Sequence, residues 1–450
     1  MIEKDTLKEF LAAVERLDAS FANLPPFEQA IPGRERLAEV LNEAAAKLRD
    51  NYPYFHPLYA GQMLKPPHPV ARLAYALAMW INPNNHALDG GRASSAMEKE
   101  AVAELAAMFG WKNHLGHLCG GGTIANLEAL WVASRVHPGK KIVASSQGHY
   151  THARISGVLQ LPFESIACDR LGRMDLGALE KKLQGGDVGT VVATMGTTAT
   201  GSIDPLPDIL ALREKYGFRV HADAAYGGYF TLAENLGATA RTAFDRLPEV
   251  DSIVVDPHKH GMQSYGCGCI LFRDPAVGQY YKHDSPYTYF SSAELHLGEI
   301  SLECSRPGAA AVALWATQRL LPLVRGGEFA LGLAKGREAA LALHRALAND
   351  SRWIVGFEPE LDIVIYAPRA ADVPGTSRRS REAFAEAAKR GLHLALAELP
   401  AKFFADSAPE LASSAETITC LRSVMMKPEH AEWVPRIFEI LGEASARNEG

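Results

Sequence analysis

The sequence predicts an α/β protein built on a mainly parallel sheet, with an N-terminal arm and a small C-terminal α+β domain. Short β-branched runs alternate with helical periodicity between about residues 70 and 325. This repeated order of strand and helix implies parallel strands joined by right-handed crossovers. At 450 residues the chain is also longer than one core usually supports, so a large domain with smaller additions is expected.

We divide the chain into three regions. Residues 1–69 are helical in pattern and then rich in proline, histidine and tyrosine, which is typical of an arm that packs on a larger body. Residues 70–325 form the predicted large domain, with strand candidates KIVAS, TVVAT, FRVHAD and SIVVD. Residues 326–450 follow an Arg-Gly-Gly break and form the predicted small domain, with strand candidates EPELDIVIYAP and TCLRSVMM.

Two connecting helices can be delimited by their end signals. Asp175 is a suitable N-cap for the first helix, and Gly185 and Gly186 end it. The second helix runs from about residue 206 to 216 and ends at Gly217, because glycine accepts the backbone conformation that closes a helix.

Composition excludes several classes of protein. The net charge is −6 and no long basic run occurs, so nucleic acid is not an expected partner. The longest nearly apolar stretch, residues 70–81, is too short to span a bilayer, and the acidic amino terminus lacks a secretory signal. Six scattered cysteines fit a reducing compartment, so we expect a cytoplasmic protein. Cys267 and Cys269 are better explained by alternation along a strand than by a metal site, and no metal is predicted.

Four motifs carry candidate chemistry, and the strongest is SIVVDPHKHG. A predicted strand runs directly into Pro257, His258 and Lys259, which places the lysine where open α/β sheets bind ligands. A lysine after a strand is common, so this motif indicates a functional site only together with the other three motifs.

The second motif, FRVHADAAYGG, places Asp223 at the end of another strand. A cofactor with a pyridine ring needs a carboxylate at its ring nitrogen, because the protonated ring draws electrons from the substrate. The small Ala225 would let that ring lie against the backbone. Alone, an aspartate at a strand end is more often a cap or turn former.

The third motif, CGGGTIANLEALW, is a glycine loop that leads into a helix, with Gly121, Gly122 and Thr123 at the junction. Free N–H groups at a helix amino terminus suit a phosphate monoester. The fourth motif, SSQGHYTHARI, places His149 after a strand, where it could stack on a cofactor ring. Otherwise His149 and His152 are turn histidines, or a pair spaced to bind a metal.

Taken in order, these motifs and the intervening ATMGTTATGSIDP resemble the group II amino acid decarboxylases of the fold-type I pyridoxal phosphate enzymes, similar to bacterial and archaeal tyrosine, aspartate and glutamate decarboxylases. The resemblance implies pyridoxal 5'-phosphate as cofactor, a small amino acid as substrate and a homodimer. It also implies that Lys259 forms the covalent link to the cofactor, Asp223 pairs with the pyridine nitrogen, His149 stacks on the ring and Ala225 supports its other face.

The same resemblance assigns further contacts. The phosphate is held by Gly121, Gly122, Thr123 and His258, and the ring's surroundings by Thr197 or its neighbour Thr198. Arg422 falls where glutamate decarboxylases carry an arginine that meets a substrate carboxylate. A loop tyrosine supplies the proton in this family, and the stretch HDSPYTYF offers Tyr287 and Tyr289. His260 departs from the family pattern, since many members have a tryptophan or another large residue after the lysine.

We expect α-decarboxylation of an L-amino acid, with a tyrosine-like aromatic substrate favoured over aspartate or glutamate. Two other classes stay open. A pyridoxal phosphate-dependent carbon–carbon lyase shares the aspartate-to-lysine spacing, but the sequence lacks the membrane segment of the sphingoid lyases. A non-catalytic pyridoxal phosphate binder would not need the candidate proton donors.

Overall fold

The structure, a computed structural model, describes residues 4–27, 33–282, 295–414 and 416–446. Its larger sheet has the strand order β1-β7-β6-β5-β4-β2-β3. The strands are β1 Leu115–Cys119, β2 Lys141–Ser145, β3 Phe163–Ile166, β4 Val188–Thr194, β5 Arg219–Asp223, β6 Ser252–Val255 and β7 Gly268–Phe272. The neighbours from β3 to β6 pair in parallel, and β7 pairs antiparallel with both β6 and β1. The predicted mainly parallel sheet is therefore confirmed.

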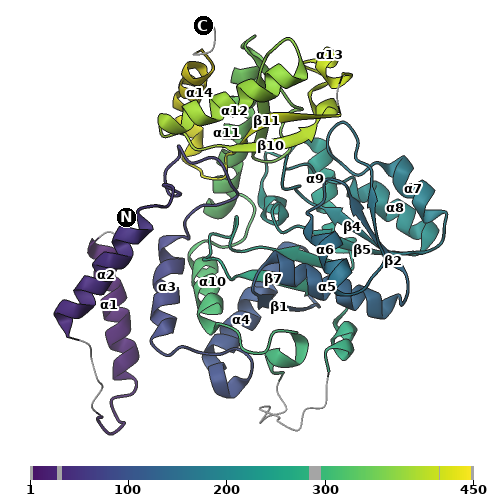
Figure 1. Ribbon diagram of the computed structural model, residues 1–450. Helices are drawn as coiled ribbons and strands as arrows, with labels where there is room; N and C mark the ends of the chain where they lie inside the picture. The colour runs from purple at the N-terminus through teal and green to yellow at the C-terminus, as the bar shows by residue number, and fades with distance from the viewer. Residues whose placement is uncertain (1–3, 28–32, 283–294, 415, 447–450) are drawn as a thin grey trace.

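Helices flank this sheet (Figure 1). They are α3 Pro69–Met79, α4 Leu88–Met108, α5 Gly122–Val136, α6 Thr151–Val158, α7 Leu176–Leu183, α8 Leu206–Tyr216, α9 Ala238–Asp245 and α10 Gly308–Leu320. Short 3₁₀ helices lie at Gly228–Leu232, Leu247–Glu249, Pro275–Tyr280, Leu297–Ile300 and Ala401–Phe404. Both delimited helices are confirmed: Asp175 caps α7 by accepting a hydrogen bond from the Ala178 N–H at 2.8 Å, and Gly217 ends α8 with φ 71°.

The carboxyl-terminal region forms a second, antiparallel sheet with the order β10-β11-β9-β8. Its strands are β8 Trp353–Val355, β9 Ile363–Pro368, β10 Ala395–Pro400 and β11 Thr417–Val424, and its helices are α11 Glu328–Ala348, α12 Val373–Lys389, α13 Pro409–Ala412 and α14 His430–Ala446. Strands β9 and β11 are the two that the sequence predicts. This sheet has its own hydrophobic core, which includes Leu343, Tyr366 and Leu421.

The arm divides into two parts. Helices α1 (Lys4–Ala19) and α2 (Arg34–Leu48) bury none of their residues and lie at the edge of the molecule beside α3 (Figure 1), where the ring of Phe10 packs edge-on against Trp80 at 6.4 Å. By contrast, the following segment packs on the smaller sheet: the Ala60 N–H donates to the His393 carbonyl, and the Val424 N–H donates to the Ala60 carbonyl. No helix in the described ranges has the length and apolar character needed to cross a membrane.

Candidate active site

A cavity of about 350 Å³ lies beside the loops that follow β1, β2, β4, β5 and β6. This is the sheet edge at which α/β proteins bind ligands. Most of the predicted site residues line it, namely Gly121, Gly122, Thr123, His149, Asp223, Ala225, His258 and Lys259. The fold thus brings together four motifs that are far apart in the chain.

Lys259 lies in the turn after β6, and its Nζ is 3.0 Å from Oδ2 of Asp256. Asp256 is buried, and its Oδ1 has no hydrogen-bond partner among the described residues. A buried carboxylate is stabilised by an adjacent cation, so this contact positions the lysine amine at the cavity wall. Sequence reasoning missed Asp256, although its place at the end of SIVVD was the available signal.

Asp223 ends β5 inside the cavity wall, and its Oδ2 is 2.8 Å from Nε2 of His152. Both side chains are buried. The other carboxylate oxygen accepts a hydrogen bond from the Ala225 N–H at 3.2 Å. His152 is thus a partner of Asp223, whereas the sequence left it as a turn histidine or half of a metal pair.

The charge of Asp223 is held by this arrangement. Burial by itself would raise the pKa of the Asp223 carboxyl, but the hydrogen bond and the charge of His152, with Lys259 and His221, lower it well below its usual range. The carboxylate therefore stays ionised across the physiological range. An ionised carboxylate at this depth is what a protonated pyridine nitrogen requires.

His149 is half-buried at the cavity wall, and its Nδ1 contacts the Thr151 hydroxyl. Burial lowers the pKa of the His149 imidazole, and the nearby Asp223 charge only partly offsets this effect. The ring is accordingly neutral near pH 7, which suits a stacking role better than an ion pair.

The glycine loop is shaped by close backbone approach. A Cβ at Gly268 would lie 2.5 Å from the Gly121 Cα, and a Cβ at Gly122 would lie 2.7 Å from Oδ2 of Asp256. Gly122 begins α5 and lines the cavity, so the free N–H groups of the first helical turn are available to bind an anion there. The ring of His258 is fixed beside the loop, because Nδ1 hydrogen-bonds with the Cys267 carbonyl at 2.9 Å.

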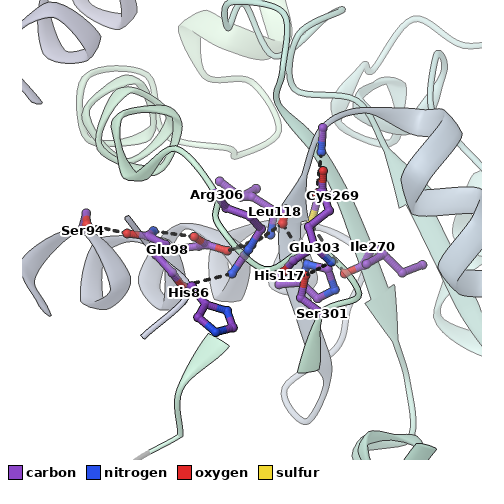
Figure 2. A network of polar contacts seen from close by, with 12 residues as sticks. His86, Ser94, Glu98, His117, Leu118, Cys269, Ile270, Ser301, Glu303 and Arg306 are labelled. Carbon is purple, nitrogen blue, oxygen red and sulfur yellow. Dashed lines mark hydrogen bonds and ion pairs between the residues drawn. The ribbon is translucent and has the colours of Figure 1, made fainter. Parts of the chain in front are cut away.

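A buried polar network holds the strand that leads into this loop (Figure 2). Oε1 of Glu98 accepts hydrogen bonds from Nη1 of Arg306 at 2.8 Å and from the Leu118 N–H at 2.9 Å. Beyond the strand, Glu303 accepts from the Gly120 N–H at 3.0 Å. The loop is therefore anchored before any ligand binds.

Thr197 lies outside the set of residues that line the cavity, and its role as a cofactor contact stays a prediction. Its hydroxyl is 2.8 Å from the Thr200 hydroxyl and accepts from the Ser202 N–H at 3.1 Å, so it is occupied within its own turn. Thr198, the alternative that the sequence left open, lines the cavity together with Gly196.

Arg422 is buried on β11, and it lies outside the set of residues that line the cavity. Its guanidinium donates to three backbone carbonyls: Gly61 at 3.0 Å, Thr198 at 2.7 Å and Ala199 at 3.1 Å. These bonds tie the arm and the GTT turn to the smaller sheet. Contact with a substrate carboxylate stays a prediction. Tyr287 and Tyr289, the predicted proton donors, lie outside the described residues.

The fold and the cavity define a protein of the pyridoxal phosphate-binding α/β class. Residues 53–368 match the family described as the pyridoxal-dependent decarboxylase conserved domain. The chain belongs to this family, and its cofactor is pyridoxal phosphate. The residues present fit that group, because an ionised buried Asp223, a lysine amine and a helix amino terminus share one cavity.

Individual relatives agree with this family. An L-tyrosine decarboxylase from Enterococcus faecium is 30% identical over 391 residues, covering 64% of this chain and 64% of the relative. An L-aspartate decarboxylase from Thermococcus kodakarensis is 30% identical over 335 residues, covering 73% and 84%. A crystal structure of Oryza sativa TDC with PLP and tryptamine superposes with a TM-score of 0.79 at 17% identity, covering 100% of this chain and 99% of that chain. This chain therefore spans a little under two thirds of the tyrosine decarboxylase.

We expect His152→Leu to make cofactor binding depend on pH. Burial raises the carboxyl pKa of Asp223, and without His152 only the weaker effects of Lys259 and His221 oppose it, so the carboxylate becomes protonated more readily as the pH falls. Losing a hydrogen bond to a charged group costs about 1.5–3 kcal/mol, or roughly ten-fold to a hundred-fold in affinity. Absorbance titration with pyridoxal phosphate between about pH 8 and 5 measures this.

Asp223→Asn is the matched control for His152→Leu. Its amide cannot ionise, so its affinity for pyridoxal phosphate should be weak and should not change with pH over this range. Equal affinities of the wild type and His152→Leu at every pH would contradict the role given to the pair.

Proposed function

We propose that this protein removes the α-carboxylate of a small L-amino acid as carbon dioxide, with pyridoxal phosphate bound through Lys259. The observation that carries the proposal is the buried Asp223–His152 pair facing the same cavity as Lys259. When bound, the cofactor supplies an electron sink for the bond that breaks. Asp223 keeps a proton at the ring nitrogen, His149 covers the ring, and Gly122, Thr123 and His258 hold the phosphate.

The cavity has features that favour an aromatic substrate. Besides Lys259, the cationic or titratable basic groups among its described lining residues are His149 and His258, and none is an arginine. Tyr150, Tyr226 and Ile124 line it as well. A departing carboxylate does not benefit from a tight ion pair, because such a pair stabilises the ground state more than the transition state. We therefore place tyrosine or a related amino acid first, with aspartate or glutamate as the alternative.

A carbon–carbon lyase and a non-catalytic binder are the rival classes. Relatives named as tyrosine and aspartate decarboxylases support decarboxylation over the lyase. A protein that only bound the cofactor would need no proton donor, whereas the sequence offers the candidates Tyr287 and Tyr289.

Lys259→Ala should abolish both turnover and the covalent link to the cofactor. Borohydride treatment of the wild type, followed by peptide mass mapping, should label the peptide that contains Lys259. Lys402→Ala, which removes a lysine in the smaller domain, is the control and should keep the label. A label on another lysine would refute the assignment, and amine release without carbon dioxide would favour a rival class.

Substrate preference can be read from amine formation with tyrosine, aspartate and glutamate. We expect tyrosine to be turned over best. We also expect Arg422→Met to lower stability, since three buried hydrogen bonds to carbonyls are lost, but to leave the order of substrates unchanged. A preference for an acidic substrate that disappears in Arg422→Met would overturn this choice.

We further propose that the protein is a homodimer whose arm helices cover the partner. Exposed apolar side chains on or beside α1 and α2 include Leu7, Leu11, Leu37, Val40, Leu41 and Leu48. A surface with so many exposed apolar residues on two helices that bury none of their residues is typical of an interface. Sedimentation velocity should give a dimer for the full chain and a monomer for Leu11→Glu/Leu41→Glu. Lys8→Glu is the control at an exposed ion pair, and a fully active wild-type monomer would exclude the proposal.

A further inference from the structure

A second cavity, of about 540 Å³, lies behind the catalytic turn. Its walls come from the end of the arm and the start of α3, from the turn after Lys259, from the start of α11 and from the segment after β11. Its volume is in the range of small-molecule sites. None of the residues assigned to the cofactor lines it, so it is separate from the active-site cavity.

Cationic side chains gather in this cavity without carboxylate partners. Lys65, Arg72, Lys335 and Lys427 line it, and no ion pair joins any of them to an acidic residue within the described ranges. Lys427 is 3% exposed and donates to the Tyr59 carbonyl at 2.6 Å, and Lys65 donates to the Met426 carbonyl at 3.3 Å. Buried charges are normally paired, but the carboxylates that act on these lysines, Asp362 and Glu429, do so from beyond ion-pair distance.

Two further polar groups in the wall have unbonded nitrogens. His260 is 1% exposed, and its Nε2 is 3.3 Å from Oδ2 of the buried Asp362, without hydrogen-bond geometry. Nε of Arg72 is buried and makes no hydrogen bond among the described residues. Because buried polar groups are nearly always hydrogen-bonded, this Arg72 nitrogen leaves a donor that a ligand in the cavity could satisfy.

The charge balance of the cavity favours an anion. Its acidic lining residues, Glu328 and Glu429, are exposed, whereas Lys427 is buried. The buried Asp362 does not line the cavity, and its two carboxylate oxygens contact Tyr226 and His260. Burial lowers the pKa of Lys65 to about 8, and burial with the neighbouring Lys65 charge lowers that of Lys427 to about 7. An anion between them would stabilise both charged forms.

The remaining wall is apolar, with Met262, Leu321, Phe329 and Leu333 among its residues. A bare inorganic ion would leave this surface uncovered, whereas an organic acid would use both parts of the wall. We propose that this cavity is a binding site for a small carboxylate with an apolar body, held by Lys427, Arg72 and Lys65. The site goes beyond the proposed function and does not depend on it. It adjoins Lys259 through His260, so an occupant would contact the turn that carries the lysine.

The test is isothermal titration calorimetry of the holoenzyme with 3-phenylpropionate, compared with its neutral isostere 3-phenylpropionamide. We expect the acid to bind and the amide to bind at least about ten-fold more weakly, because charge-assisted hydrogen bonds are lost. Arg72→Gln and Lys427→Gln should each weaken binding by about ten-fold or more. Lys389→Gln, at an exposed ion pair on α12, is the control and should bind like the wild type.

Gly332→Leu gives a variant that does not remove a charge. A Cβ at Gly332 would meet Pro428 at 3.4 Å, an ordinary contact, so a leucine can enter the cavity without displacing the backbone. It should block 3-phenylpropionate while leaving the melting temperature unchanged or higher, since glycine is a poor helix former. If Lys427→Gln fails to fold because its bond to Tyr59 is lost, Arg72→Gln and Gly332→Leu still decide the question.

Equal binding of acid and amide would overturn the proposal, as would unchanged binding in both Arg72→Gln and Gly332→Leu. Binding that is lost on adding a turned-over amino acid but kept in Gly332→Leu would place the probe in the active site and would also overturn it. A protein that bound the probe as expected but released no carbon dioxide would contradict the proposed function alone.

Discussion

The structure of this site depends on keeping one buried carboxylate ionised. Asp223 lies at the end of an interior strand, where burial raises the pKa of its carboxyl. His152, in the first turn of α6, lowers that pKa through a hydrogen bond and its charge. His221, on the same strand, is occupied elsewhere: it contacts the Ser252 hydroxyl and the Asn126 side chain, each at 2.8 Å. The negative charge of the Asp223 carboxylate therefore lies at the cavity, where a pyridinium ring would need it.

A second constraint is the space available to the backbone. Gly268 on β7 and Gly121 in the loop approach so closely that no side chain fits between them. This contact brings the antiparallel strand β7 against the glycine loop that lines the cavity and leads into α5. A side chain at either glycine would therefore displace this loop.

The smaller domain takes part in the site through buried polar contacts. Arg422 joins the GTT turn to the arm, and Asp362 accepts a hydrogen bond from the hydroxyl of Tyr226, which lines the active-site cavity. Burial raises the pKa of the Asp362 carboxyl to about 6, with the Tyr226 bond and Lys65 acting in the opposite direction. Each cavity therefore has a lining residue, Tyr226 in the first and Lys65 in the second, that bonds to a group of the carboxyl-terminal region.

The local chemistry and the order of the elements could be predicted from the amino-acid sequence. Local features depend on neighbours in the chain, so they could be predicted, and most of them were confirmed. They are the strand periodicity, the cap at Asp175, the glycine at 217 and the strand before Lys259. The family resemblance likewise rested on short motifs. Which side chains meet across strands became visible only in the folded chain. His152 contacts Asp223, and Asp256 contacts Lys259. Thr197 hydrogen-bonds within its own turn, and Arg422 donates to backbone carbonyls. These partners depend on burial and on which hydrogen-bonding groups the distant segments leave unsatisfied.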